Sequence, residues 1–196
     1  MHLTMRLHNP WRNLVAEPVA RDHFVQVYRD EAALLDAVSL FTVAAIGRND
    51  AVVLVATPEH GEAVRKVLDS SGLDPEILEG WGQLQVHDAE ALLTRFMVDG
   101  EPHAGAFQSL ADGLIGSARA SGRFRHVRVY GEMVNLLWGD NLPAAVRLEQ
   151  LWNEVIEEHS ISLFCAYGLE PVGPLQSLPR SVKRLHTHFI PLEGCA

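Results

Sequence analysis

Side chains that can donate, accept or titrate recur directly after the apolar runs of this sequence. Parallel strands bring their carboxyl ends to one edge of a sheet, and ligands bind outside that edge. We therefore expect a binding site built from residues that follow strands. The candidate ligand-binding residues are Tyr28, Arg29, Thr57, His60, His87, Glu132, Trp138 and Tyr167. Tyr28, Glu132, Trp138 and Tyr167 are expected to converge on one cavity.

Glu132 follows the apolar run that ends in Val129-Tyr130-Gly131. A nucleotide hydrolase would carry its metal-holding acid at such a position, so Glu132 could be a ligand-binding or metal-binding carboxylate. It could equally be an acid at the start of a helix, stabilised there by the helix dipole. The sequence leaves both alternatives open.

The first turn after a strand does not suit a phosphate group. A phosphate-binding loop needs several glycines and a lysine. Here the turn reads Tyr28-Arg29-Asp30-Glu31-Ala32, with no glycine, no lysine and two acids. This composition argues against ATP binding of the standard kind.

The histidines and cysteines give weaker indications. His186 and His188 could form a metal pair in an extended tail, but they supply two ligands where structural zinc usually needs four. We expect no stoichiometric metal and no cofactor. His23 opens a strand and is expected to be a hydrogen-bonded structural residue, and Cys165 a small buried hydrophobe. Neither a Gly-x-Ser-x-Gly elbow nor a Cys-x-x-Cys pair occurs, which removes the simplest hydrolase and redox interpretations.

Trp138 has two interpretations. It follows a short helical stretch after Glu132 and could fold over the sheet edge to line a pocket for a small organic molecule. Alternatively it is a core residue, as Trp152 is expected to be from its apolar stripe with Leu148 and Leu151.

The elements that must position these residues alternate between strand and helix. Five apolar runs predict strands: 23–28, 51–56, 81–87, 126–131 and 161–167. Start signals and helical periodicity predict helices between them: 31–46, 58–71, 89–98, 101–122, 132–138 and one from 143 onward. Nearly continuous apolar strands separated by helices indicate a mainly parallel sheet covered on both faces. The prediction is a three-layer α/β/α fold.

The domain organisation follows from the same pattern. Residues 1–21 are expected to form a loose leader, and 22–193 a single domain. From about residue 170 onward the prolines predict a tail, either a short helix or an extension wrapping the core.

Composition narrows the class of protein. The chain has 196 residues, is 47% hydrophobic and carries a formal charge of −9. Such a charge disfavours broad electrostatic binding to nucleic acid. The longest apolar run has six residues, far short of the roughly 20 needed to cross a bilayer. Two cysteines make no disulfide framework, so the cytoplasm is the expected location.

Several segments form an ordered series that resembles a known family. They are 23–28 with Glu31 and Leu34-Leu35, 53–58, 96–100, Tyr130-Gly131-Glu132-Met133 with Leu137-Trp138, 148–153, 163–167 and His186-Thr187-His188. Together they resemble the MEDS domain, the methanogen/methylotroph DcmR sensory domain, over roughly residues 22–193.

The resemblance implies a diverged relative of RecA/KaiC-type ATPases that has lost its phosphate loop. It further implies a sensory role for small organic compounds in bacterial or archaeal signalling. Members are often joined to a DNA-binding domain or a histidine kinase. This sequence contains neither, so output is expected through a signalling partner protein, either a histidine kinase or a transcription regulator. A homodimer is possible.

Two other functions remain open at this stage. One is a nucleotide-binding or ATP-hydrolysing RecA-like module that retains Glu132. The other is a metal-dependent enzyme that combines Glu132 with the tail histidines. The missing glycines and lysine argue against the first, and the second requires Glu132 to meet His186 and His188 in space.

Overall fold

A computed structural model describes residues 10–169 and 177–190. Its centre is a six-stranded, entirely parallel sheet in the order β3-β2-β6-β7-β1-β8. The strands are β1 (His23–Tyr28), β2 (Ala51–Ala56), β3 (Leu84–Asp88), β6 (Val127–Gly131), β7 (Ser162–Gly168) and β8 (His188–Ile190). A separate antiparallel pair joins β4 (Met97–Val98) to β5 (Glu101–Pro102).

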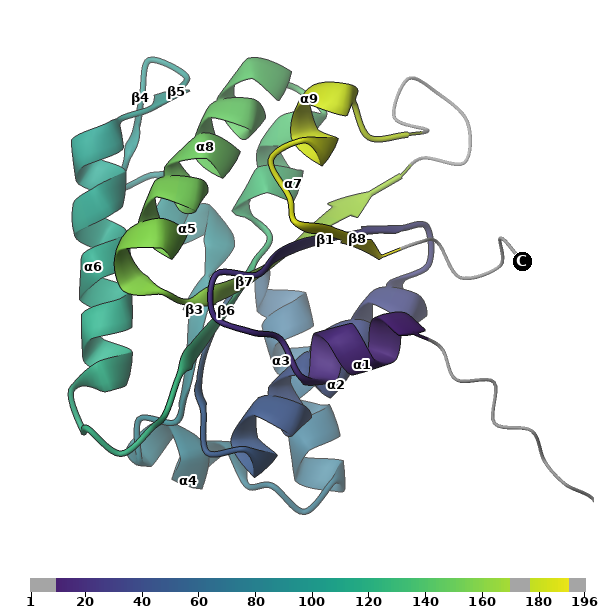
Figure 1. The fold of residues 1–196 in the computed structure, drawn as a ribbon, viewed down its shortest axis with the longest axis vertical. Helices are drawn as coiled ribbons and strands as arrows, with labels where there is room; N and C mark the ends of the chain where they lie inside the picture. Colours follow the sequence, from purple (N-terminus) through teal and green to yellow (C-terminus); the bar gives the residue numbers. More distant parts are fainter. Residues whose placement is uncertain (1–9, 170–176, 191–196) are drawn as a thin grey trace, which may run out of the picture.

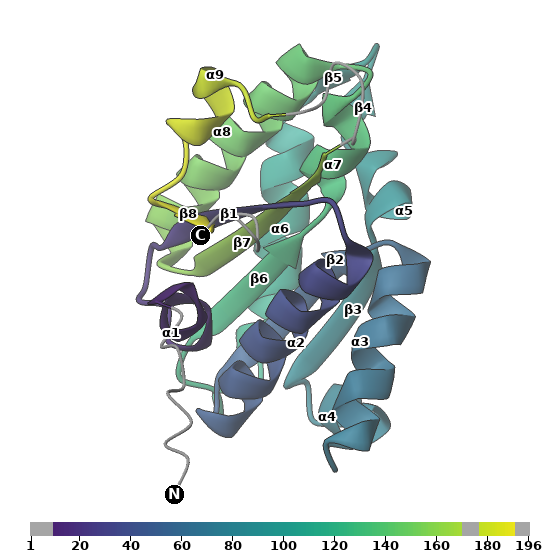
Figure 2. The ribbon, with the colours of Figure 1, turned by 90° about the vertical axis from the view of Figure 1, so that its right-hand side faces the viewer.

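Helices cover both faces of the sheet (Figures 1 and 2). One face carries α1 (Pro10–Ala16), α2 (Glu31–Gly47), α3 (Pro58–Ser70) and α4 (Pro75–Gly80). The other carries α5 (Ala89–Leu93), α6 (Ala104–Arg119), α7 (Met133–Trp138), α8 (Leu142–His159) and α9 (Arg180–Lys183). The predicted three-layer α/β/α fold is therefore confirmed.

Two hydrophobic cores lie on either side of the sheet, because successive strand residues point to opposite faces. In β2, Val53 and Val55 pack towards α6, whereas Val52 and Leu54 pack into the core beneath α2 and α3. Every residue of β1, β2 and β6 is buried. A parallel sheet covered on both faces requires such continuous apolar runs.

Local capping explains where the helices around the site begin. Asp30 has an extended backbone, and its side chain accepts a hydrogen bond from the Ala32 N–H, which starts α2. Thr57 caps α3 in the same way, followed by Pro58 in the first turn. In α3, a Cβ on Gly61 would lie 3.0 Å from Val86, so glycine allows the helix to approach β3 closely.

Several boundaries differ from the sequence prediction. The segment predicted to begin a strand at residue 81 instead ends α4, and β3 starts at Leu84. The predicted helix 89–98 stops at Leu93, and a hairpin follows. Asp99 and Gly100 both have positive φ, the conformation that a tight two-residue Asp-Gly turn requires. This turn delays the next helix until Ala104.

The two ends of the described chain are more ordered than expected. In place of a wholly loose leader, residues 10–16 form α1, whose Trp11 and Val15 are buried against the α2 side of the core. The tail contains both predicted possibilities, a short helix (α9) and an extension that adds β8 beside β1. No helix among residues 10–169 and 177–190 is both long and apolar enough to span a bilayer.

Candidate functional site

Glu132 lies at the carboxyl end of β6 and is almost completely buried. Its Oε2 accepts a hydrogen bond from the Thr57 N–H at 2.8 Å. Its Oε1 accepts one from the Tyr130 hydroxyl at 2.6 Å and lies 2.7 Å from His60 Nδ1. Glu132 occupies the N-cap position of α7, as the helix-start alternative expected, but its side chain makes no cap hydrogen bond. The Glu132 carboxylate instead links β6, through Tyr130, to the turn before α3, through Thr57, and to α3 itself, through His60.

His60, in the first turns of α3, connects two carboxylates. Its Nδ1 donates to Glu132, and its Nε2 donates to Glu31 Oε2 at 2.5 Å. Both ring nitrogens therefore face acceptors, an arrangement that only the protonated imidazolium satisfies fully. One ring links the turns that follow β1, β2 and β6.

The electrostatics agree with this geometry. The hydrogen bond to Glu132 raises the pKa of His60 to about 9, against the opposing effect of burial and with further support from Glu31. Burial, together with the charges of Glu31 and Glu132, raises the pKa of the Tyr28 hydroxyl. At neutral pH the site thus holds a cationic imidazole and a protonated phenol.

A groove of about 540 Å³ opens above His60 between α2 and α3. Its exposed surface is mostly apolar. The lining residues are Glu31, Ala32, Leu35, Thr57, Glu59, His60 and Ala63. The groove lies at the carboxyl edge of the sheet, where an open parallel sheet is expected to bind ligands.

The predicted residues divide between this groove and other places. Thr57 and His60 line it, and Glu132 binds both of them from below. Tyr28 lies on the same face, where its hydroxyl is 3.4 Å from Asn135 Nδ2. Thr57, His60 and Glu132 are thus joined by hydrogen bonds, and Tyr28 lies in the same hydrophobic face of the sheet.

Trp138 and Tyr167 do not join that group, which corrects the expectation of a single cavity. They pack edge to face, with ring centroids 5.5 Å apart, in the core beneath α8. The cause is strand alternation, since Tyr167 and Tyr28 come from neighbouring strands but point to opposite faces. Trp138 is therefore a core residue.

Arg29 and His87 also lie outside the groove lining. Arg29 is exposed in the turn after β1. His87 is the second-last residue of the edge strand β3, where its Nε2 lies 3.1 Å from Gln85 Oε1. Burial lowers the pKa of His87, and the charge of Arg95 lowers it further, so this ring is neutral at pH 7.

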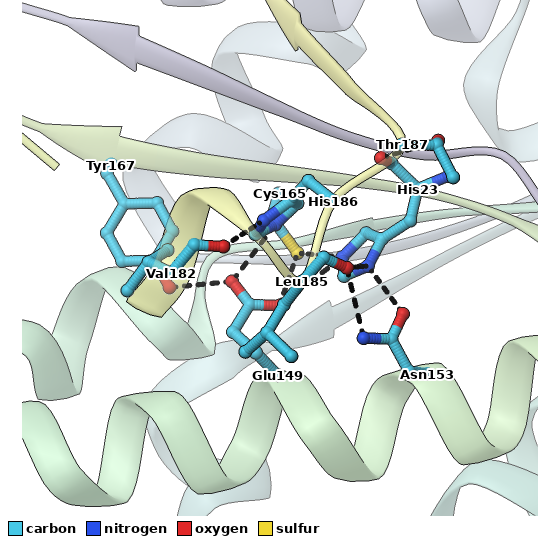
Figure 3. A network of polar contacts seen from close by, with 9 residues as sticks. All are labelled: His23, Glu149, Asn153, Cys165, Tyr167, Val182, Leu185, His186 and Thr187. Carbon is cyan, nitrogen blue, oxygen red and sulfur yellow. Dashed lines mark hydrogen bonds and ion pairs between the residues drawn. The ribbon is translucent and has the colours of Figure 1, made fainter. Parts of the chain in front are cut away.

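The two tail histidines, His186 and His188, contact different parts of the protein. His188 lies in β8 with its Nε2 3.2 Å from Asp22 Oδ1. His186 precedes β8, and its side chain points towards α8, where its Nε2 lies 3.3 Å from Glu149 Oε1 (Figure 3). Glu149 is on the α8 face and Glu132 on the α2 and α3 face. The structure therefore does not bring Glu132 and the tail histidines into one metal site.

Glu31 and Glu149 are not among the site residues that the sequence predicts. A carboxylate in the first turn of a helix that follows a strand, as Glu31 is, lies at the same sheet edge as His60. Glu149 lies next to the apolar residues Leu148, Leu151 and Trp152 in α8 and is fully buried. The position of Glu149 beside this apolar helical stripe is the sequence feature that could have indicated a buried carboxylate.

Burial acts to raise the pKa of Glu149, but His186 and His23 outweigh it and hold that pKa well below its ordinary value. The Tyr167 hydroxyl donates to Glu149 Oε1 at 2.6 Å. Burial, then the charge of Glu149, raises the pKa values of Tyr167 and Cys165. Glu149 thus carries the negative charge in the cluster that it forms with His23, Cys165, Tyr167 and His186.

Another hollow, of about 280 Å³, lies at the opposite, amino-terminal edge of the strands. It contains Arg48, Arg125 and the buried Arg128. The Arg128 guanidinium is already bound by Asp50 Oδ2, at 2.7 Å from Nη2, and by the Ala16 carbonyl, at 2.9 Å from Nη1. These contacts fix α1 and β2 to β6 and give Arg128 a structural role.

The fold is a three-layer α/β domain with a parallel central sheet. Its structure is similar to the crystal structure of a KaiC-like protein from the hyperthermophilic archaeon Pyrococcus horikoshii, with a TM-score of 0.57 and 11% sequence identity. The similarity covers 85% of this chain and 68% of that one and concerns the fold alone. The comparison with curated proteins finds no match.

Residues 22–181 match the family model of the MEthanogen/methylotroph, DcmR Sensory domain. The chain belongs to this MEDS family. The resemblance seen in the sequence is thereby confirmed, with a matched region that ends before His186.

Proposed function

We propose that this protein is a cytoplasmic sensor that binds a small organic molecule in the groove between α2 and α3 and passes the signal to a partner protein. Membership of a sensory-domain family supports the general role. The observation that carries the specific site is His60, which sits in the lining of an apolar groove while it bridges two carboxylates.

The charges around the groove define the class of ligand. Glu31 and Glu59 line it and Glu132 lies beneath it, whereas among the described lining residues His60 is the one cation. An anionic ligand would be repelled by this excess of carboxylates. Ala32, Leu35 and Ala63 favour contact with hydrocarbon. A neutral or cationic organic compound of low molecular weight, such as a short alcohol or amine, fits both features.

Signal transmission would start at His60. The His60 ring joins the beginnings of α2 and α3 to the turn before α7. A ligand that replaces Glu31 or Glu132 as a hydrogen-bond partner of His60 would therefore remove one of the contacts between these elements. Such a ligand shifts the population of two states only through a difference in its affinity for them. A histidine kinase or a transcription regulator that contacts α2 or α3 would respond to that shift.

Ligand-observed NMR on the full chain tests the proposal. The probes are alcohols, amines and carboxylates of up to about four carbons, a size that an apolar pocket of this kind accommodates. We expect neutral or cationic members to bind and carboxylates not to bind. The variant Ala63→Phe fills the groove and should abolish binding.

Ala104→Phe is the matched control, since Ala104 is exposed at the start of α6 and far from the groove lining. It should bind like the unchanged protein. Equal binding by Ala63→Phe and Ala104→Phe, or no binding by any probe, would refute the proposed site.

A further inference from the structure

Four side chains with metal-binding groups meet on the α8 face of the sheet, away from the groove (Figure 3). They are His23 at the start of β1, Glu149 in α8, Cys165 in β7 and His186 after α9. One ligand atom from each lies within 4.8 Å of all the others. Each of these side chains is at most 2% exposed. Segments far apart in the sequence thus build one closed cluster.

Three of the ligand atoms are spaced as in a tetrahedral centre, and His186 Nε2 lies within 4.8 Å of a ligand atom of each other residue. Zinc bonds of about 2.0–2.2 Å to nitrogen and oxygen and about 2.3 Å to sulfur place neighbouring ligand atoms about 3.3–3.6 Å apart. His23 Nε2 lies 3.3 Å from Glu149 Oε2 and 3.5 Å from Cys165 Sγ. Cys165 Sγ lies 3.6 Å from Glu149 Oε2, and His186 Nε2 lies 3.3 Å from Glu149 Oε1. A single ion could contact all four residues.

The two imidazoles are oriented as metal ligands are. A ligating histidine usually donates its other ring N–H to a carbonyl or carboxylate, which fixes the tautomer. His23 Nδ1 faces the Asn153 side-chain oxygen at 2.9 Å and the Leu185 carbonyl at 3.1 Å. His186 Nδ1 faces the Val182 carbonyl at 2.9 Å. Both Nε2 atoms therefore point into the cluster.

One of these atoms lacks a hydrogen bond. His186 Nε2 is buried and, among the residues that the structure describes, has no hydrogen-bond partner despite its proximity to Glu149. An unsatisfied buried polar atom is costly and calls for an explanation, such as an ion. A metal ion bound to His186 Nε2 would accept the lone pair of this nitrogen and take the place of the missing hydrogen bond.

Charge balance also favours a divalent ion. A thiolate from Cys165 and the carboxylate of Glu149 supply two negative charges, and two neutral imidazoles add none. A 2+ ion makes the complete centre neutral, which removes the cost of an uncompensated charge in the interior. The Tyr167 hydroxyl, which donates to Glu149 Oε1, supplies an outer hydrogen bond to the carboxylate.

We propose that His23, Glu149, Cys165 and His186 bind a divalent transition metal, with zinc as the best match to two nitrogens, one oxygen and one sulfur. This proposal replaces the expectation of no stoichiometric metal, which considered only the pair His186 and His188 and not the cluster that folding assembles. Four protein ligands in a closed site are typical of structural zinc. The ion fastens the segment that carries α9 and β8 to α8 and the sheet. This site is independent of the proposed ligand groove, so either can fail without the other.

The test uses the full chain with Cys195→Ser throughout, so that Cys165 is the remaining cysteine of the sequence. Protein purified without chelator should contain about one zinc per chain by elemental analysis. After metal removal, added Zn²⁺ should raise the melting temperature. Added Co²⁺ should give thiolate-to-cobalt charge-transfer absorption in the near ultraviolet and the visible bands of a tetrahedral centre.

Two variants locate the metal. Cys165→Ala should remove the charge-transfer absorption, and Glu149→Gln, which keeps the shape of the side chain, should lower the metal content. His188→Gln is the matched control, because His188 is a neighbouring tail histidine outside the cluster, and it should retain the metal. If a ligand variant does not fold, the Co²⁺ spectrum of the parent protein decides alone. Absence of both zinc and the cobalt charge-transfer band in that parent would overturn the proposal.

Discussion

At the scale of single residues, the protein contains two buried carboxylates, and each is surrounded by polar partners. Glu132 is satisfied by the Thr57 amide, the Tyr130 hydroxyl and the His60 ring. Glu149 is surrounded by two histidines, a tyrosine and a cysteine on the other face of the sheet. A buried charge is tolerated only when it is paired and hydrogen-bonded.

His60 should make the stability of the protein depend on pH. Its pKa is raised to about 9 in the folded state by the hydrogen bond to Glu132, and in the unfolded chain it returns to about 6.5. The stabilising contribution is therefore complete below about pH 6.5 and is lost as the pH rises through about 9. His60→Gln should destabilise the protein more at pH 6 than at about pH 9.5, as measured by urea unfolding.

His87→Gln is the control for this experiment. Because the pKa of His87 is lowered, its ring is neutral above about pH 7 in both the folded and unfolded states. Its effect on the free energy of unfolding should not change over the alkaline part of the range. A His60→Gln effect that is constant or grows with pH would contradict the assignment of a cationic His60.

Trp138 should behave as a core residue. Only 5% of it is exposed, and its ring packs on Tyr167. Trp138→Ala should lower the free energy of unfolding by about 3–5 kcal/mol, because it leaves a cavity. Trp81, which is 59% exposed, is the matched control, and Trp81→Ala should change stability by about 0.5 kcal/mol or less. Equal losses in the two variants would show that the ring of Trp138 is not packed.

At the scale of elements, the two ends of the described chain complete the sheet and its cover. β8 adds a sixth parallel strand beside β1, in register Phe24 with His188. α1 packs on α2 and receives a hydrogen bond from Arg128 at the Ala16 carbonyl. A three-residue strand and a seven-residue helix are short, so tertiary contacts stabilise them more than local propensity does.

Removal of the anchor of α1 tests this dependence. Trp11 is 6% exposed within the core beneath α2, so Trp11→Ala should cost about 3–5 kcal/mol of stability. Asn13→Ala, on the exposed side of the same helix, should be nearly neutral. Denaturant unfolding of the two variants gives the comparison, and a neutral Trp11→Ala would mean that α1 does not contribute to the fold.

At the scale of the whole molecule, a fold similar to that of a KaiC-like protein carries acidic side chains at the carboxyl edge of its sheet. The turn that begins α2 places Asp30 and Glu31 at the sheet edge, and the chain carries a formal charge of −9. Glu132, at the end of β6, already accepts three hydrogen bonds from protein groups. These acids and the occupied carboxylate of Glu132 argue against nucleotide binding at this edge.

ATP or GTP with magnesium should therefore not stabilise this protein. A ligand present at 100 times its dissociation constant adds about 2.7 kcal/mol to the free energy of unfolding, which a thermal melt detects readily. We expect no rise in melting temperature at millimolar nucleotide. A clear rise with either nucleotide would favour the RecA-like nucleotide-binding alternative.

The sequence by itself determined the layered parallel fold and the family, and it predicted the sheet edge at which the proposed groove lies. Apolar strands of regular length, each followed by a capped helix, leave few other arrangements. The same regularity placed Tyr28, Thr57, His60 and Glu132 at one edge, because strand ends are local features that a linear pattern reveals.

Only the tertiary structure decided which side chains meet across the sheet. Whether Tyr167 points towards α2 or α8 depends on strand register, and a shift by one residue reverses it. The Glu149 cluster combines residues separated by more than 100 positions, including His23 and His186, and no local pattern encodes that contact. The partners of Glu132 and Glu149 were therefore fixed by folding, since long-range packing selects which polar groups are buried together.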